Sequence, residues 1–322
     1  MAEGRRGLWY GFAAYAMWGL FPLFWPLLEP AGAADILANR MVWSLVAVAL
    51  MLLVQRRWAW IRPLLAQPRR LALSALAAAV ISVNWGVYIW SVNAGHVVET
   101  SLGYFINPLV TIGFGVLVLR ERLRRAQWVA VGTGAAAVVV LAVGYGRLPW
   151  IALTLALSFA TYGLLKKRVA LGGPESLALE SAAMFPFALA FLGYLAVRGE
   201  GSFGRVVPGE YGWGHSWLLI LSGVITAVPL ICFGAAAVRV PLTTLGLLQY
   251  LAPVFQFLIG VVVMHEEMPP ARWAGFGLVW VALLVLTVDA LVRVRTDRAA
   301  TAAARARAAA GLPAAEPTAV TS

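Results

Sequence analysis

The residues best suited to bind a solute lie within apolar segments long enough to cross a membrane. Ser101, Tyr104, Asn107 and Thr111 recur at spacings of three and four within residues 99–121, so on a helix they share one face. Unsatisfied polar groups are costly in hydrocarbon, and a lipid-facing helix therefore has no use for such a stripe. The pattern predicts a helix that turns this polar face toward a cavity inside the protein.

A second apolar segment repeats this one. Aligning Pro108 with Pro253, an offset of 145 residues, also superimposes Tyr104 on Gln249, Thr111 on Gln256 and Glu121 on Glu266. Each proline lacks a backbone N–H and frees a carbonyl one turn earlier, so we expect a helix break at both. Two broken helices with polar groups at corresponding places are typical of transporters whose site lies between repeats.

Arg40 is the strongest single candidate for binding. It lies about two turns, roughly 9 Å, inside an expected span at residues 34–54. A charge at that depth costs at least ~2.5 kcal/mol unless it is paired or reaches the interface. Arg40 therefore either snorkels, pairs with Asp35 or Glu99, or binds an anionic or carbonyl group of a solute.

Asn84 and Tyr88 stand four residues apart in an expected span at residues 71–91, so they share a helix face. An asparagine within the bilayer needs a hydrogen-bond partner, and Asn84 either joins two helices or lines the cavity. The complete set of candidate solute-binding residues is Arg40, Asn84, Tyr88, Tyr104, Asn107, Thr111, Gln249 and Gln256.

Four titratable residues near the ends of spans are candidates for coupling or gating: His96, Glu99, Glu121 and Glu266. His96 and Glu99 could bind protons during transport, or could simply be solvated in a loop. Glu121 and Glu266 could each cap the N-terminus of the next helix, or form a pair of gates.

Composition places the chain among polytopic membrane proteins. Of its 322 residues, 61% are hydrophobic and only 12% are charged, and the mean hydropathy is +0.82. We expect an all-α fold with ten transmembrane helices of about 20 residues each. The expected spans are residues 8–28, 34–54, 71–91, 98–119, 126–144, 148–165, 176–197, 216–237, 241–264 and 272–292.

Lys and Arg are distributed unequally between the connections. With the N-terminus inside, 20 of the 25 fall on the inner side and four on the outer side. The positive-inside rule then places both termini in the cytoplasm. The net charge of +11 is thereby explained by topology and contact with anionic lipid, and nucleic acid is not an expected partner.

The repeat unit is five spans long, because YAMWGLF at residues 15–21 also aligns with FATYGLL at 159–165. An odd number of spans inserts the second copy with inverted topology. We therefore expect one five-helix repeat at residues 1–147 and another at 148–295. The remaining residues, 296–322, are rich in Ala, Arg and Pro, which predicts a disordered cytoplasmic tail.

Motifs for several other chemistries are missing from the sequence. It contains no H-E-x-x-H, P-loop, G-x-S-x-G or aspartate-rich prenyl-binding motif, and Cys232 is its single cysteine. We expect no catalytic residue, no metal and no cofactor.

Several segments resemble the EamA-type transporters of the drug/metabolite transporter superfamily, and more narrowly the RarD branch, which is named for chloramphenicol sensitivity. They include WGLFP (18–22), DILANR (35–40), NWGVYIWSVN (84–93), ETSLGYFINPL (99–109) and PLTTLGLLQYLAP (241–253). The resemblance covers residues 8–292. It implies a bacterial inner-membrane protein with two inverted five-helix repeats and a central cavity, which moves small solutes, usually outward, by alternating access. The residues that match the branch's motifs and face inward are Arg40, Asn84, Tyr88, Tyr104, Asn107 and Gln249, whereas Asn39 stands where the branch usually has histidine.

The leading hypothesis is a secondary active transporter, acting as an exporter of a small metabolite or drug-like solute, with proton or counter-substrate coupling. The expected partners are that solute and the lipid bilayer, and the expected oligomeric state is a monomer or homodimer. One alternative is a membrane-embedded carrier or enzyme acting on lipid-linked substrates, which a side portal flanked by basic residues would favour. Another is a non-transporting partner or sensor subunit, which binding of the tail to a cytosolic protein would favour.

Overall fold

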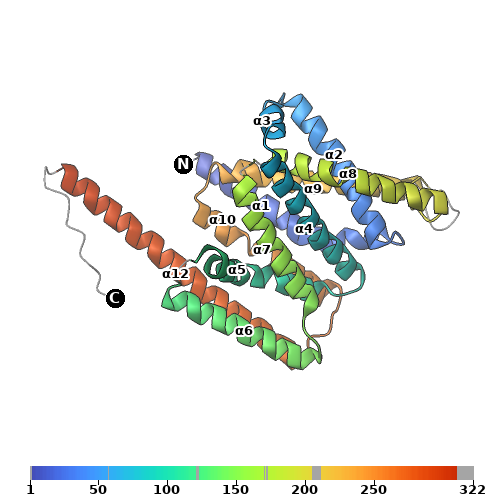
Figure 1. Cartoon of the computed structure of the whole chain (residues 1–322). Helices are drawn as coiled ribbons and strands as arrows, with labels where there is room; N and C mark the ends of the chain where they lie inside the picture. Colours follow the sequence, from blue (N-terminus) through green and yellow to red (C-terminus); the bar gives the residue numbers. More distant parts are fainter. Residues whose placement is uncertain are drawn as a thin grey trace.

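The computed structural model describes residues 2–56, 58–120, 123–169, 171, 173–204 and 212–309, and the regular structure within them is entirely helical (Figure 1). In chain order the helices are α1 (Ala2–Leu20), the 3-10 turns η1 (Phe21–Leu23) and η2 (Trp25–Leu28), α2 (Ala33–Val54), α3 (Ile61–Leu65), α4 (Pro68–Asn93), α5 (Val97–Leu119), α6 (Arg125–Tyr145), α7 (Trp150–Val169), α8 (Gly173–Arg198), α9 (Trp213–Ala237), α10 (Leu242–Leu248), α11 (Leu251–Leu258), the π-helical turn η3 (Ile259–Val263) and α12 (Pro270–Ala309).

Eight of these segments are long and apolar enough to cross a membrane, and α7 contains a shorter apolar helix. The all-α, multi-span architecture is therefore confirmed, but length and composition alone do not yield ten spans in the described residues. The helix expected at residues 8–28 does not run through as one piece: α1 ends at Leu20 and two 3-10 turns follow. Pro22 and Pro26 lie in the first positions of these turns, and neither can donate the N–H that would continue the α-helix.

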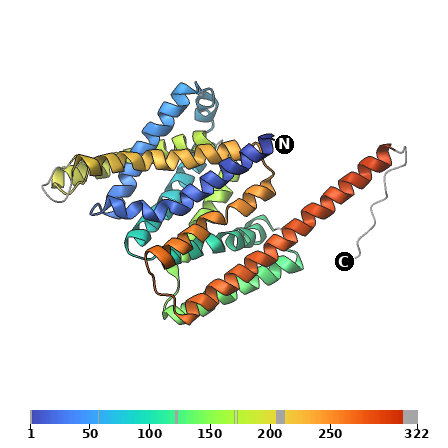
Figure 2. The same ribbon diagram turned by 180° about the vertical axis from the view of Figure 1, so that it is seen from behind.

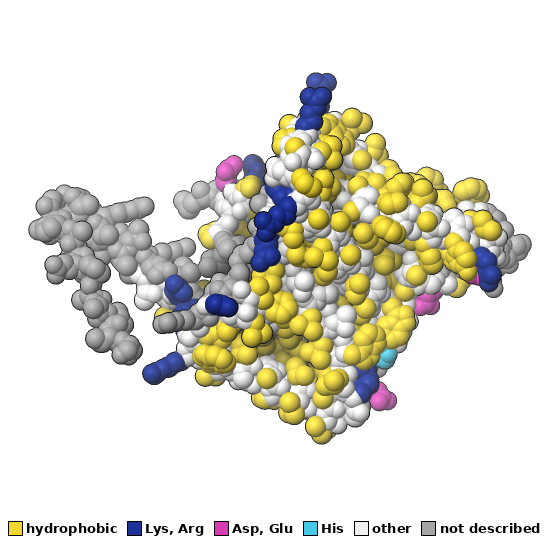
Figure 3. All heavy atoms as spheres, in the orientation of Figure 1, with side chains coloured by type: hydrophobic (Ala, Val, Ile, Leu, Met, Phe, Trp, Pro, Cys, Tyr) yellow, Lys and Arg dark blue, Asp and Glu magenta, His cyan; other side chains and the backbone are white. Residues whose placement is uncertain are grey.

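The two halves of the chain interleave rather than forming separate bundles. Helix α12 lies along α6, α2 packs against α8 and α9, and α5 packs against α7 and α11 (Figures 1 and 2). Apolar side chains cover most of the face seen in Figure 3, and most Lys and Arg side chains lie toward its edges. A surface of this kind suits a protein surrounded by lipid.

Helices α2 and α9 are in backbone contact at Gly223. A Cβ atom placed on Gly223 would lie 2.3 Å from the carbonyl carbon of Trp43 and 2.6 Å from the amide nitrogen of Ser44. Only glycine permits this contact between two backbones. It sets α9 against the part of α2 that carries Arg40.

The prolines of the two repeats act differently. Helix α5 continues through Pro108 without interruption, so the break expected there is wrong. The corresponding segment is divided, because α10 ends at Leu248 and α11 begins at Leu251. Pro253 has no N–H to donate to the carbonyl of Gln249, one turn earlier, which accounts for a break at this place.

Helix α12 extends further than the sequence predicted. The expected disordered tail began at residue 296, but the helix continues to Ala309 (Figure 2). Alanine and arginine have high helix propensity, which favours continuation through this Ala- and Arg-rich run. Residues 310–322 lie outside the described part of the chain.

Candidate functional site

Arg40 lies in the interior of the protein, where its side chain is held from two sides. Only 3% of the residue is exposed. Its Nε atom donates a hydrogen bond of 2.8 Å to the Oγ1 atom of Thr226 on α9. The guanidinium carbon lies 4.1 Å from the ring centre of Trp85 and 5.2 Å from that of Trp25, which are cation–π distances. Arg40 is therefore fixed in place, and it does not snorkel to the membrane surface.

The carboxylates that the sequence offered as partners for Arg40 are bound elsewhere. Asp35 accepts hydrogen bonds from the Nδ2 atom of Asn39, at 2.8 Å, and from the amide and hydroxyl of Ser202. Glu99 forms an ion pair of 2.8 Å with Arg147. Within the described residues no carboxylate lies within 4.0 Å of the Arg40 guanidinium, so both predicted ion pairs of Arg40 are wrong.

Three of the predicted polar residues do meet near Arg40. The Nδ2 atom of Asn84 donates to the carbonyl of Leu155, at 3.0 Å, and to the hydroxyl of Ser158 on α7, at 2.9 Å. The Oδ1 atom of Asn84 accepts from the hydroxyl of Tyr104 at 3.3 Å. The rings of Tyr88 and Tyr104 meet edge to face, with their centres 5.8 Å apart. Asn84 thus joins two helices, as one of its two interpretations predicted, and it also orients Tyr104.

Five residues form what we call the Arg40 cluster: Trp25, Arg40, Trp85, Tyr88 and Tyr104. Both phenols are close enough to Arg40 to interact with it electrostatically. Within the part of the chain that the structure describes, three buried polar atoms of the cluster have no hydrogen-bond partner, namely Nη1 of Arg40, the hydroxyl of Tyr88 and Nε1 of Trp25. Buried polar groups are normally satisfied, and all three of these can donate a hydrogen bond. The cluster is therefore suited to a ligand that supplies acceptor atoms.

The other predicted binding residues lie apart from these contacts. Thr111 is exposed, and its hydroxyl donates to the carbonyl of Asn107 within the same helix. The Oδ1 atom of Asn107 is buried and has no hydrogen-bond partner among the described residues. Gln249 is half-buried at the end of α10, and Gln256 donates a hydrogen bond of 3.4 Å to the carbonyl of Trp18. The last contact ties α11 to α1.

Glu266 joins the second repeat to the first. Its carboxylate accepts hydrogen bonds from the amides of Val97 and Val98, at the N-terminus of α5. Glu266 therefore caps a helix N-terminus, but the helix it caps is α5, so the prediction that it caps the next helix, α12, is wrong. Burial raises the pKa of Glu266, and these amides and Arg272 partly offset that effect. Gly260 allows the close approach, because a Cβ there would lie 2.8 Å from a methyl of Val98.

Glu99, in the first turn of α5, makes a similar contact. Besides its ion pair with Arg147, it accepts a hydrogen bond of 3.2 Å from the amide of Ile151 in the first turn of α7. The ring of His96 lies 6.1 Å from that of Trp90, centre to centre. Glu121 lies outside the described residues. Two carboxylates at this end of the molecule thus connect the repeats through helix N-termini.

Acidic residues buried in the second repeat were missed by the sequence analysis. Glu180 lies seven residues into α8, where it forms an ion pair of 3.2 Å with Lys166 and accepts hydrogen bonds from Tyr162 and Ser176. Trp25 and Thr226 of the Arg40 region were also missed. A tryptophan and a threonine in apolar segments carry no distinctive signal in a single sequence.

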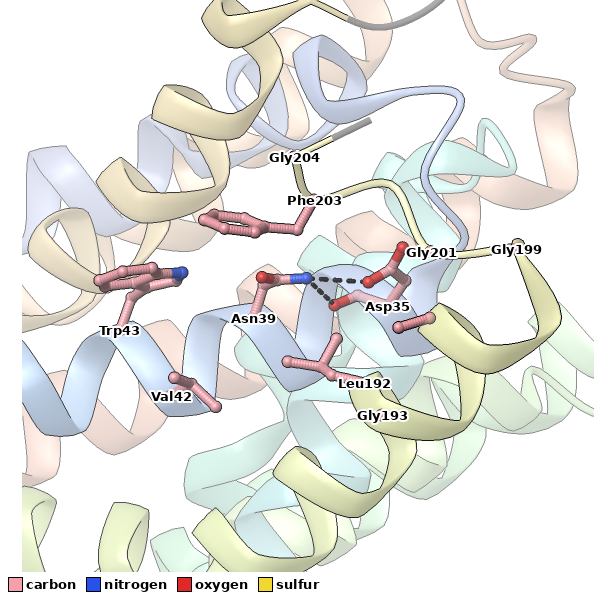
Figure 4. Close-up of a pocket in the computed structure, with 11 residues that line it drawn as sticks. Asp35, Asn39, Val42, Trp43, Leu192, Gly193, Gly199, Gly201, Phe203 and Gly204 are labelled. Carbon is pink, nitrogen blue, oxygen red and sulfur yellow. Dashed lines mark hydrogen bonds between the residues drawn. The ribbon is translucent and has the colours of Figure 1, made fainter. Parts of the chain in front are cut away.

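A separate pocket of about 610 Å³ opens between α2 and the end of α8 (Figure 4). Asn39 and Asp35 line it, hydrogen-bonded to each other, and the rings of Trp43 and Phe203 lie 5.7 Å apart beside them. Asn39 and Arg40 are adjacent in sequence and differ by about 100° around the helix, so they serve different surroundings. This pocket carries a polar pair that is already satisfied.

Comparison with known proteins decides the family. Residues 5–143 and 148–288 each match the EamA-like transporter family. The chain belongs to that family. It is 64% identical over 297 residues to "Protein RarD" of Streptomyces exfoliatus, covering 92% of this chain and 93% of the relative, which supports the RarD branch. An uncharacterized transporter, YojE of Bacillus subtilis (strain 168), is 45% identical over 291 residues, covering 89% of this chain and 95% of the relative.

A solved crystal structure shares the fold of this EamA-family chain. The two superpose with a TM-score of 0.53 at 18% sequence identity, covering 87% of this chain and 97% of the other. The two family matches correspond to α1–α6 and to α7–α12, so the two-repeat organisation is established. The chain is a multi-pass membrane protein of a transporter family.

Proposed function

We propose that the protein is a secondary active transporter that exports a small solute bearing a carboxylate or another acceptor group. The observation that carries this proposal is Arg40, buried at 3% exposure with a free Nη1 atom and no carboxylate beside it in the described residues. Maintaining an unpaired charge in the interior is costly, and intramembrane ionisable residues mark substrate pathways by default. A solute that supplies the counter-charge explains why the cost is tolerated.

The surroundings of Arg40 suggest how the solute is held. The hydroxyl of Tyr88 and the indole N–H of Trp25 can donate to the same acceptor group. Trp85 and Tyr104 offer aromatic surface for an apolar part of the solute. Asn107, with a free Oδ1 atom, lies one turn further along α5 from Tyr104 and could bind a donor group of the solute.

Transport by such a site requires access from each side in turn. We propose that the chain spans the bacterial inner membrane ten times, as two repeats of inverted topology with both termini in the cytoplasm. The start of α1 and the far end of α12 project toward the same side in Figures 1 and 2, which supports an even number of crossings. Relative movement of the repeats at α5 and at the divided segment α10–η3 would open the site alternately.

A ligand panel tests the proposal. Amino acids, aromatic metabolites and chloramphenicol are added to the purified protein, and the melting temperature is followed for wild type and Arg40→Ala. A ligand at 100 times its Kd stabilises by about 2.7 kcal/mol. Stabilisation by acidic members that is lost in the variant supports the proposal. Stabilisation that survives in Arg40→Ala would place the ligand elsewhere and assign Arg40 a structural role.

A further inference from the structure

The charges around the Arg40 cluster bear on how transport is coupled. This step rests on the proposed function. Arg40 brings one positive charge to the cluster, and among the described residues the ionisable groups that act on it are Tyr88 and Tyr104, which are neutral phenols. Asp35 is occupied by Asn39 and Ser202. A ligand with a single negative charge would therefore neutralise the cluster, whereas a neutral ligand would leave the guanidinium unpaired.

In a transporter that works by alternating access, the charge of Arg40 affects the rate at which the site changes from one side of the membrane to the other. Between its two open states the site has to close on both sides, which leaves the guanidinium away from water, as it is in this structure, where 3% of Arg40 is exposed. Closure around Arg40 alone leaves an unpaired cation in a medium of low dielectric, which costs free energy. Closure around an ion pair of Arg40 and an anion avoids this cost. The guanidinium cannot escape this penalty by losing its proton, because arginine remains charged in proteins. Thr226 and the two indole rings offset only part of it.

We propose that the protein is an obligatory exchanger of monoanions, in which an anion must occupy the Arg40 cluster during each change of access. A solute leaving the cell would be replaced by a second anion on the return. The ligand class is a monocarboxylate or similar acid whose apolar part packs against Trp25, Trp85 and Tyr104. The pocket beside Asn39 takes no part, because its polar groups are paired with each other.

Proteoliposomes containing the full chain provide the test. The outside medium holds radiolabelled N-acetyl-L-phenylalanine, and the lumen holds either the same acid unlabelled or its neutral analogue N-acetyl-L-phenylalaninamide. Potassium and valinomycin on both sides clamp the membrane potential at zero, so that charge movement itself does not slow net uptake. Uptake into acid-loaded vesicles should exceed uptake into amide-loaded vesicles at least about tenfold, because the barrier to returning unloaded is higher.

Two substitutions separate the exchange mechanism from a merely structural role of Arg40. Arg40→Lys keeps the charge and should keep the ratio between exchange and net uptake. Arg40→Gln removes the charge, so the ratio should fall to near one and the neutral amide should itself become a transported solute. Gel filtration and melting temperature check that both variants are folded. If Arg40→Gln fails to fold, the wild-type ratio and Arg40→Lys still decide the matter.

The outcomes discriminate between the two proposals. Equal rates in acid-loaded and amide-loaded vesicles, with uptake dependent on the protein, would overturn obligatory exchange while leaving the transport function intact. Transport of the amide by wild type at the rate of the acid would overturn the monoanion assignment. Absence of any protein-dependent flux of either compound would refute the proposed function and this inference with it.

Discussion

Substituting Gly223 with alanine should disturb the Arg40 cluster without touching any of its residues. The new methyl would lie 2.3 Å from the carbonyl carbon of Trp43, whereas ordinary contacts begin at 3.4 Å, so α2 and α9 must separate by about 1 Å. Thr226 lies one turn beyond Gly223 and bonds to Arg40, one turn before Trp43. The hydrogen bond of 2.8 Å would be stretched beyond hydrogen-bonding distance.

The expected loss of stability combines two effects. Overpacking a tight contact costs about 1–3 kcal/mol, and loss of a hydrogen bond to a charged group costs about 1.5–3 kcal/mol. At about 2 °C per kcal/mol for a chain of this size, the melting temperature in detergent should fall by roughly 5–12 °C. Affinity for any acid found in the ligand panel should fall as well, because Arg40 loses its anchor on α9.

Gly234 on the same helix is the matched control. No atom of the described residues lies within 4 Å of a Cβ placed on Gly234, so Gly234→Ala should melt at or slightly above the wild-type temperature. Equal melting temperatures for Gly223→Ala and Gly234→Ala would refute the reasoning, because they would show that α2 and α9 are not in backbone contact at Gly223.

Three further predictions concern other contacts. Because the pKa of Glu266 is raised on folding, the folded protein binds more protons than the unfolded chain at pH values between the ordinary and the raised pKa. The stability of the fold should therefore fall as pH rises through that window. In Glu266→Gln the melting temperature should depend less on pH across the same window. Asn84→Leu leaves the hydroxyl of Tyr104 without its partner and removes two hydrogen bonds to α7, and it should lower the unfolding free energy by about 1–3 kcal/mol in a detergent titration. Trp85→Leu removes the ring 4.1 Å from the guanidinium and should cost about 0.5–2 kcal/mol, whereas an unchanged midpoint would show that this contact contributes nothing.

The sequence predicted the class of fold, and four of the eight candidate binding residues do lie near one another in the structure. Length and hydropathy of the apolar runs define nearly all of the spans, and the offset of 145 residues anticipates the two family matches. Arg40, Asn84, Tyr88 and Tyr104 were predicted as candidates because polar groups at helical spacing are costly in lipid, and the structure places them near one another.

The sequence did not predict the partners of buried charged residues, because these partners depend on which helices pack against each other. Asp35 is five residues from Arg40 and suggests an ion pair, yet it turns to Ser202, which is 167 residues away. Likewise, Glu266 caps α5 rather than α12, because the repeats interleave. Helical periodicity fixes the face that a residue occupies but not the neighbour that this face contacts.

The most direct test of the account is the binding of an acid and its amide to one protein with and without Arg40. Calorimetry would give the affinities of N-acetyl-L-phenylalanine and N-acetyl-L-phenylalaninamide for wild type and for Arg40→Gln. Close charge pairs couple by at least about 1.5 kcal/mol, so wild type should prefer the acid by more than about tenfold, and Arg40→Gln should show no preference. An equal preference for the acid in both proteins would contradict the claim that Arg40 binds the anionic group of the solute.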